Sequence, residues 1–165
     1  MKYTKNKLLT LTLALVSILM TVVVVNAIPL YGEMALDFMA PGPTHPVLLI
    51  DPVWSGTISG DDINGKMFFY NTGGKDVGQA HFFEETWLIT DDDLNTLLTG
   101  TDSGVVSWAN DKYRMNGVVT EAYGDYAHLV GHNVHMSGSI TWQNIGTPEE
   151  PDMIPATAPG MFRVN

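Results

Sequence analysis

Several acidic, imidazole and phenol side chains stand at positions that are otherwise apolar. The segments 79–90, 96–108, 112–122 and 126–142 each alternate, and one phase of each is mainly large and apolar. Successive side chains of a strand point to opposite faces, so residues of one phase share a face. The polar members of the apolar phase are the candidate ligand-binding residues, namely His81, Glu85, Asp102, Tyr113, Glu121, Tyr126, His128 and His132.

These residue types are suited to acid–base chemistry when they share an interior. Burial raises the pKa of a carboxyl group toward neutrality, where a proton is easily given or taken. We expect His128 or His132 to share the interior with Glu85 or Glu121, since unpaired buried polar groups are costly. The alternative is that some of these groups lie at strand ends in water, while the others form structural hydrogen bonds.

The assignment of faces is less firm in two of the four segments. In 79–90 the opposite phase also carries apolar residues, Phe82 and Leu88. The segment 126–142 is too long for one straight strand, and a bulge near 131–133 would reverse the direction of its first half.

The histidines do not predict a metal site. His128 and His132 are about 13 Å apart along an extended strand, and His135 faces the other side. The run Asp91–Asp93 lacks the alternating pattern of a calcium loop and indicates a solvated turn. Neither a nucleophile elbow nor a phosphate or dinucleotide loop is present, so we expect no cofactor and assign no catalytic residue.

The rest of the chain predicts the strands that must position these groups. Almost nothing after Trp54 has helical periodicity, and turn residues separate the alternating segments. A short strand is expected around Met34–Phe38, and Gly146–Pro159 is expected to be an exposed loop. The further strands are expected near 53–60, 63–71, 79–90, 96–108, 112–122, 126–142 and 160–165.

Three strands repeat a pattern in which a large apolar residue, a glycine and a β-branched residue share one face. The glycines of this pattern are Gly56, Gly117 and Gly138. Glycine on the concave face of several strands is what a tightly curved sheet requires. We therefore predict an all-β fold, a single closed or nearly closed antiparallel barrel of about eight strands.

The same strands carry a resemblance to known proteins. Gly-Thr-Ile-Ser-Gly-Asp from Gly56, Val-His-Met-Ser-Gly from Val134 and the final Gly160–Asn165 resemble segments of secreted archaeal proteins. More remotely, the pattern of strands resembles the eight-stranded barrels of allene oxide cyclases and dirigent proteins. The resemblance implies a barrel, but it brings no catalytic motif to these residues.

The first residues are typical of an export signal. Three lysines precede an uncharged run, Leu8–Val25, and the small residue Ala27 follows two positions later. The predicted organisation is a signal peptide over 1–27, a proline-rich segment over 28–52 containing the short strand, and a barrel domain over 53–165. The protein is then secreted or extracytoplasmic. An uncleaved membrane anchor is the alternative, since the run is just long enough to span a bilayer.

The amino-acid composition limits the kinds of partner that the protein can bind. Cleavage would change the formal net charge of the chain from −10 to −13 by removing three lysines, and such a surface repels nucleic acid and anionic membranes. The chain has no cysteine, which excludes thiol chemistry.

The apolar segment 47–50 is expected to cover one end of the domain.

Three functions remain open from the sequence. The first is non-catalytic binding of a small apolar ligand or a partner by an exported barrel. The second is an isomerase or cyclase with its active site in the barrel lumen, which convergence of histidine and carboxylate would favour. The third is a structural surface domain with a filled core, which a cavity below about 100 Å³ would favour, since ligand pockets usually exceed roughly 300 Å³.

Overall fold

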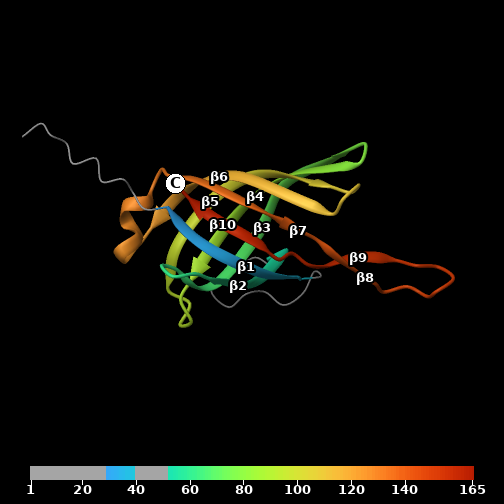
Figure 1. The fold of residues 1–165 in the computed structure, drawn as a ribbon, viewed down its shortest axis with the longest axis horizontal. Helices are drawn as coiled ribbons and strands as arrows, with labels where there is room; N and C mark the ends of the chain where they lie inside the picture. Colours follow the sequence, from blue (N-terminus) through green and yellow to red (C-terminus); the bar gives the residue numbers. More distant parts are fainter. Residues whose placement is uncertain (1–28, 40–51) are drawn as a thin grey trace, which may run out of the picture.

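The computed structural model describes residues 29–39 and 52–165, and in this part the chain is built almost entirely of strands (Figure 1). The expected signal peptide and the apolar segment 47–50 lie outside the described residues. One short 3-10 helix, η1, spans Gly124–Leu129. The strands are β1 Leu30–Phe38, β2 Trp54–Ser59, β3 Asn64–Val77, β4 Ala80–Thr90, β5 Thr96–Ser107, β6 Lys112–Ala122, β7 Asn133–Ser139, β8 Thr141–Asn144, β9 Met153–Thr157 and β10 Gly160–Val164.

Eight of these strands form a closed antiparallel barrel, which confirms the predicted fold class. Strands β1 to β7 pair in chain order, and β10 then pairs with β7 on one side and β1 on the other. The strand expected within 28–52 is β1, and it is a full member of the barrel. Leu30 lies opposite Val164 of β10, and Met34 lies opposite Ile58 of β2. The ring therefore has no free edge.

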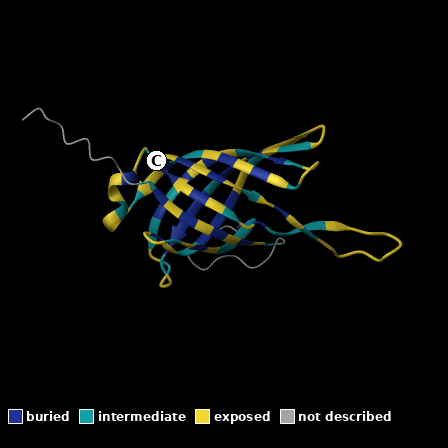
Figure 2. Ribbon diagram, viewed as in Figure 1, coloured by how far each residue is buried: buried dark blue, intermediate teal, exposed yellow. Residues whose placement is uncertain are grey.

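Buried and exposed residues alternate along the strands of the barrel (Figure 2). In β1 the burial pattern alternates strictly over Leu30–Asp37, as expected for a strand with one face in a core. One half of the lumen is filled by large side chains. Trp87 and Phe162 are fully buried there and meet edge to face, with ring centroids 5.5 Å apart.

The segment 126–142, expected as one strand, is divided into three elements. Gly124 and Gly131 both have positive φ, 58° and 83°, which reverses the chain on either side of η1. Strand β7 begins only at Asn133, and β8 begins at Thr141 after Ile140. The prediction of one long strand was therefore wrong, because the turns consume its first seven residues.

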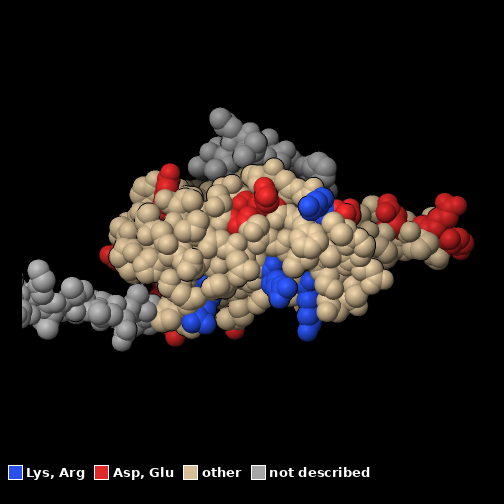
Figure 3. All heavy atoms as spheres, turned by 90° about the horizontal axis from the view of Figure 1, so that it is seen from above, with Lys and Arg blue, Asp and Glu red and all other residues tan. Residues whose placement is uncertain are grey.

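A hairpin of β8 and β9 projects from one end of the barrel (Figure 1). The loop expected over 146–159 therefore contains a strand, since Met153–Thr157 pairs with Thr141–Asn144. Glu149, Glu150 and Asp152 are exposed near its tip, and acidic groups cover that end of the molecule in Figure 3. Strand β9 also meets β1, where Asp37 lies opposite Thr157.

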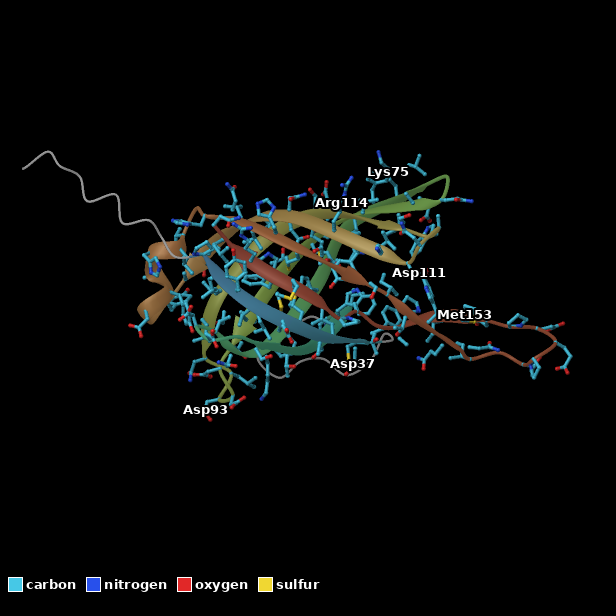
Figure 4. The ribbon with its side chains drawn as sticks, viewed as in Figure 1. Asp37, Lys75, Asp93, Asp111, Arg114 and Met153 are labelled. Carbon is cyan, nitrogen blue, oxygen red and sulfur yellow. The ribbon has the colours of Figure 1, made fainter. Side chains whose placement is uncertain are left out.

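The two ends of the barrel differ. Figure 4 shows Asp111, in the β5–β6 turn, at the end from which the hairpin projects, and Asp93, in the β4–β5 turn, at the opposite end. We call the end beside Asp111 the hairpin end and the end beside Asp93 the helix end, because η1 lies there (Figure 1). Leu129 of η1 is buried in the core at the helix end.

Candidate functional site

The lumen wall formed by β4, β5 and β6 is organised in layers set by the strand register. Because these three strands pair without interruption from the hairpin end as far as Gly100, their inward residues line up across the wall. From the hairpin end inward, the layers are His81–Val106–Tyr113, Phe83–Gly104–Met115, Glu85–Asp102–Gly117 and Trp87–Gly100–Val119. Trp87 belongs to the filled half of the lumen, so the Glu85 layer lies directly above this floor.

Above the floor, the hairpin end of the barrel contains a cavity of about 300 Å³. An artificial apolar cavity of about 150 Å³ holds benzene, so this one has room for a larger molecule. Its surface is mainly aromatic and aliphatic. The aromatic residues around it are Phe38, Trp54, Phe69, Phe83, Trp108 and Tyr113.

Few polar side chains line the cavity, and they lie at different depths. Asp76 and His81 are at its mouth, whereas Glu85 is at its base with its β3 ladder partner Asn71. His81 and Glu85 are four residues apart on β4, so about 13 Å separates their layers. Phe83 lies between them on the same face. A ligand would therefore meet polar groups at both ends of an apolar channel.

Glu85 and Asp102 form a pair of buried carboxyl groups. They are direct partners in the β4–β5 ladder, and their side chains are only 6% and 7% exposed. Directly opposite residues in a ladder have Cβ atoms about 5 Å apart. Neither carboxyl oxygen of Asp102 has a hydrogen-bond partner.

The absence of a side chain on a neighbouring glycine leaves space for the side chain of Asp102. Gly117 is the β6 partner of Asp102, and a Cβ atom placed on it would lie 2.6 Å from the Asp102 Cβ and 2.2 Å from the Thr101 carbonyl oxygen. A side chain at position 117 would therefore collide with both. The glycine expected on the concave face thus leaves space for a buried carboxyl group.

Burial keeps this pair partly protonated near neutral pH. Burial, and then the charge of Asp102, raises the pKa of Glu85 from its ordinary 4.5 to about 8. Burial raises the pKa of Asp102 from 3.8 to about 7. Two charges about 5 Å apart would repel by about 3 kcal/mol at an effective dielectric constant of about 20, so full ionisation is disfavoured. The pair can therefore donate or accept a proton near pH 7.

Tyr113 closes one side of the cavity. Its hydroxyl donates to the carbonyl oxygens of Ala158 and Pro159, each at 3.4 Å, in the connection between β9 and β10. Gly138 and Gly160 follow Tyr113 across the next two strands, and a Cβ on either would collide with the phenol oxygen. Burial, and then the charge of Glu85, raises the pKa of Tyr113, so the phenol stays neutral.

At the mouth, His81 is held by a neighbour on the adjoining strand. Its Nδ1 lies 2.8 Å from Oδ1 of Asp76 on β3, and the two residues are ladder partners. Its ring also lies near Trp108, at 6.0 Å between centroids. Trp108 in turn meets Trp142 of β8 edge to face at 5.5 Å, which links the mouth to the projecting hairpin.

The other four candidate residues do not reach this site. Glu121 is exposed and accepts a hydrogen bond from the Tyr123 hydroxyl, at 2.8 Å. The reason is a bulge in the β5–β6 ladder between Thr99 and Gly100, after which the inward phase of β6 changes. The apolar phase of β6 therefore ends at Val119.

The remaining three lie around η1 at the helix end. The Tyr126 ring packs on the core, but its hydroxyl donates to the Asp62 carbonyl oxygen at 2.8 Å. His128 is exposed, with Nδ1 2.9 Å from the Asp125 carbonyl oxygen, and His132 is half-buried at the end of the turn before β7. The expectation that either histidine shares the lumen with Glu85 or Glu121 was wrong, because this segment is not a strand.

Two features of the site were not expected from the sequence. Asp76 falls in a segment read as a turn between strands, yet β3 continues to Val77 past a bulge between Asn71 and Gly73. Trp108, the last residue of the segment 96–108, shares the alternating phase of Asp102, but it was not among the candidate residues. The sequence signal that could have predicted this pair is a two-residue hairpin turn at Gly78–Gln79. Such a turn places Asp76 opposite His81.

The fold and cavity define a small antiparallel barrel with one filled end and one hollow end. No protein-family model matches the chain, and no curated protein or solved structure matches it. Within residues 29–39 and 52–165, no group of three or more histidine and acidic residues could hold a metal ion. The same residues contain no helix of the length and apolarity needed to cross a membrane.

Proposed function

We propose that the protein binds a small, mainly apolar ligand in the hairpin end of the barrel. The observation that carries this proposal is the cavity of about 300 Å³ above a lumen that is otherwise filled. This volume lies at the lower end of the range for ligand pockets and well above what a filled core leaves. The aromatic lining supplies contact area, and the few polar groups at mouth and base would orient the ligand.

The test narrows the cavity by enlarging one side chain of its wall. Val106 lines the cavity, whereas its neighbour Val105 faces the outside of the same strand. We expect Val106→Phe to weaken binding of 1-hexanol at least tenfold, and Val105→Phe to leave it unchanged. Binding is followed by NMR through the indole signals of Trp54 and Trp108, which both line the cavity. Equal affinities for the two variants would contradict the proposal.

Acid–base catalysis, such as isomerisation or cyclisation, is a second candidate for the same lumen. The observation in its favour is that Glu85 and Asp102, with pKa values raised to about 8 and 7, lie below a cavity that also contains His81. A group that titrates near the working pH is best suited to moving protons. If the site does so, the protein should speed deuterium exchange into 2-hexanone in D₂O, and Glu85→Gln should abolish the effect.

A further inference from the structure

The base of the cavity has a chemical character different from that of its walls. Glu85 lines the cavity and Asp102 lies beside it, each more than nine-tenths buried. Both carboxyl oxygens of Asp102 lack a hydrogen-bond partner. Buried polar atoms in folded proteins are nearly always satisfied, so two orphaned acceptors next to a cavity indicate a missing donor.

No basic side chain supplies that donor from the cavity lining. The residues around the cavity include no lysine or arginine, and the one imidazole, His81, is engaged with Asp76 at the mouth. Two carboxyl groups with no cation beside them are costly to ionise in a buried position. A donor that enters with the ligand would satisfy the acceptors and, if positively charged, would offset the repulsion between the two groups.

The walls above the carboxyl groups suit the rest of such a ligand. Phe83 stands in the layer directly above Glu85, and Tyr113 stands in the next layer. Phe69 of β3 and its ladder partner Trp54 of β2 also line the cavity. Aromatic faces attract cations and also accept apolar groups. The negative net charge of the chain would raise the local concentration of a cation near the mouth.

We propose that the ligand is an organic cation, a protonated amine whose ammonium group pairs with Glu85 and Asp102 and whose apolar body lies among the aromatic side chains above them. This inference rests on the proposed binding function and names the class of ligand for it. Binding requires the carboxyl pair to give up protons, so an amine should bind more tightly as the pH rises, and it should release protons into solution. A neutral ligand of the same shape should show neither effect.

The test compares three probes of equal length on the full chain at pH 8.5, namely hexylamine, 1-hexanol and hexanoate. Calorimetry should show that hexylamine binds at least tenfold more tightly than 1-hexanol, while hexanoate binds most weakly. Between pH 6 and pH 8.5 the affinity for hexylamine should rise at least tenfold and that for 1-hexanol should not change. These comparisons use the unmodified protein, so they do not depend on how a variant folds.

Variants then locate the effect. Glu85→Gln keeps the shape of the side chain, and we expect it to reduce the preference for hexylamine over 1-hexanol at least tenfold. Asp102→Asn should reduce the same preference. The control is Glu84→Gln, because Glu84 is the exposed neighbour on the outside of β4, and this variant should behave like the unmodified protein.

The outcomes separate the two proposals. Binding of 1-hexanol without a preference for hexylamine, or a preference for hexanoate, would overturn the cation while leaving the binding function in place. A preference that survives in Glu85→Gln and Asp102→Asn would also overturn it. Failure of all three probes to bind would overturn both the cation and the cavity as a ligand site.

Discussion

Glu85 and Asp102 face each other as direct partners across the β4–β5 ladder, both buried and both on the inner face of the barrel. Like charges directly opposite in a ladder are destabilising, and burial adds a cost of desolvation. The fold therefore tolerates an arrangement that stability alone does not favour. Such arrangements concentrate at functional sites, where the cost is retained for binding or chemistry.

The carboxyl pair makes the stability of the protein depend on pH in a defined direction. The pKa values of Glu85 and Asp102 are raised on folding to about 8 and 7 from ordinary values of 4.5 and 3.8. Between these limits the folded chain binds more protons than the unfolded chain, so the free energy of unfolding falls as the pH rises. We expect urea denaturation midpoints to fall from pH 5 to pH 8.5 and then to level off.

A matched set of variants separates this effect from general repulsion in an acidic chain. The double variant Glu85→Gln/Asp102→Asn should have a much flatter profile and a higher midpoint than the unmodified protein at pH 8.5. Glu84→Gln also removes one negative charge, but from the outer surface, and should keep the slope. If the double variant and Glu84→Gln have the same profile, the two carboxyl groups are not buried together.

Glycines on the inner face should be far less tolerant than their neighbours. A Cβ on Gly138 would lie 2.1 Å from the Pro159 carbonyl oxygen and 2.6 Å from the Tyr113 hydroxyl, while Ser137 is exposed on the outer face. We expect Gly138→Val to cost roughly 1–3 kcal/mol or more, because the backbone must move. Ser137→Val should change stability by less than about 0.5 kcal/mol. Equal melting temperatures would mean that the two faces of β7 are wrongly assigned.

Asp111 fastens the projecting hairpin to the barrel. Its Oδ1 accepts a hydrogen bond from Trp142 Nε1 at 2.9 Å, its carbonyl oxygen accepts one from the Ile140 amide at 2.7 Å, and its φ is 56°. Asp111→Ala loses the side-chain acceptor and disfavours the left-handed backbone, a cost of roughly 1–3 kcal/mol. Asp111→Asn keeps both features and should stay within about 0.5 kcal/mol.

Hydrogen exchange provides the local measurement for this prediction. Amide protons of β8, Thr141–Asn144, should exchange faster in Asp111→Ala than in Asp111→Asn. Unchanged exchange in the alanine variant would show that the Trp108–Trp142 contact holds the hairpin without Asp111.

The predictability of the site from sequence depends on how the strands are connected. The inward placement of His81, Glu85, Asp102 and Tyr113 could be predicted from alternation, because the ladders that join β4, β5 and β6 are regular from the hairpin end to Gly100. An ambiguity remained in β4, whose outward residue Leu88 is also buried. It belongs to a separate cluster outside the barrel wall, formed with Phe68 and Tyr70.

Beyond the regular ladders, alternation in the sequence no longer predicts on which face of the barrel wall a side chain lies. A single bulge in the ladder at Thr99–Gly100 turns the side chain of Glu121 to the outer face. Gly124 and Gly131, with positive φ, form turns on either side of η1, which stands where a strand was expected. The bulge inserts one residue into β6, and because the period of a strand is two, the β6 residues beyond it change face. The turns around η1 instead take Tyr126, His128 and His132 out of the sheet. Barrel closure itself depends on the pairing of β1 with β10, a long-range contact that local patterns do not encode.

Export is a separate prediction, based on residues 1–27 alone. Cleavage after Ala27 would leave β1, which begins at Leu30, complete and able to pair with β10. N-terminal sequencing of the protein from the culture medium should therefore begin at Ile28. Protein that stays with the membrane fraction and retains Met1 would contradict this prediction.

The most direct test of the account is a crystal structure of the protein grown with hexylamine at pH 8.5. The account predicts one amine in the hairpin-end cavity, with its nitrogen about 3 Å from a carboxylate oxygen of Glu85 and its alkyl chain between Phe83 and Tyr113. A lumen filled by side chains down to Trp87, or an amine bound only outside the barrel, would contradict the claim that the hollow end is a ligand site built on a buried carboxyl pair.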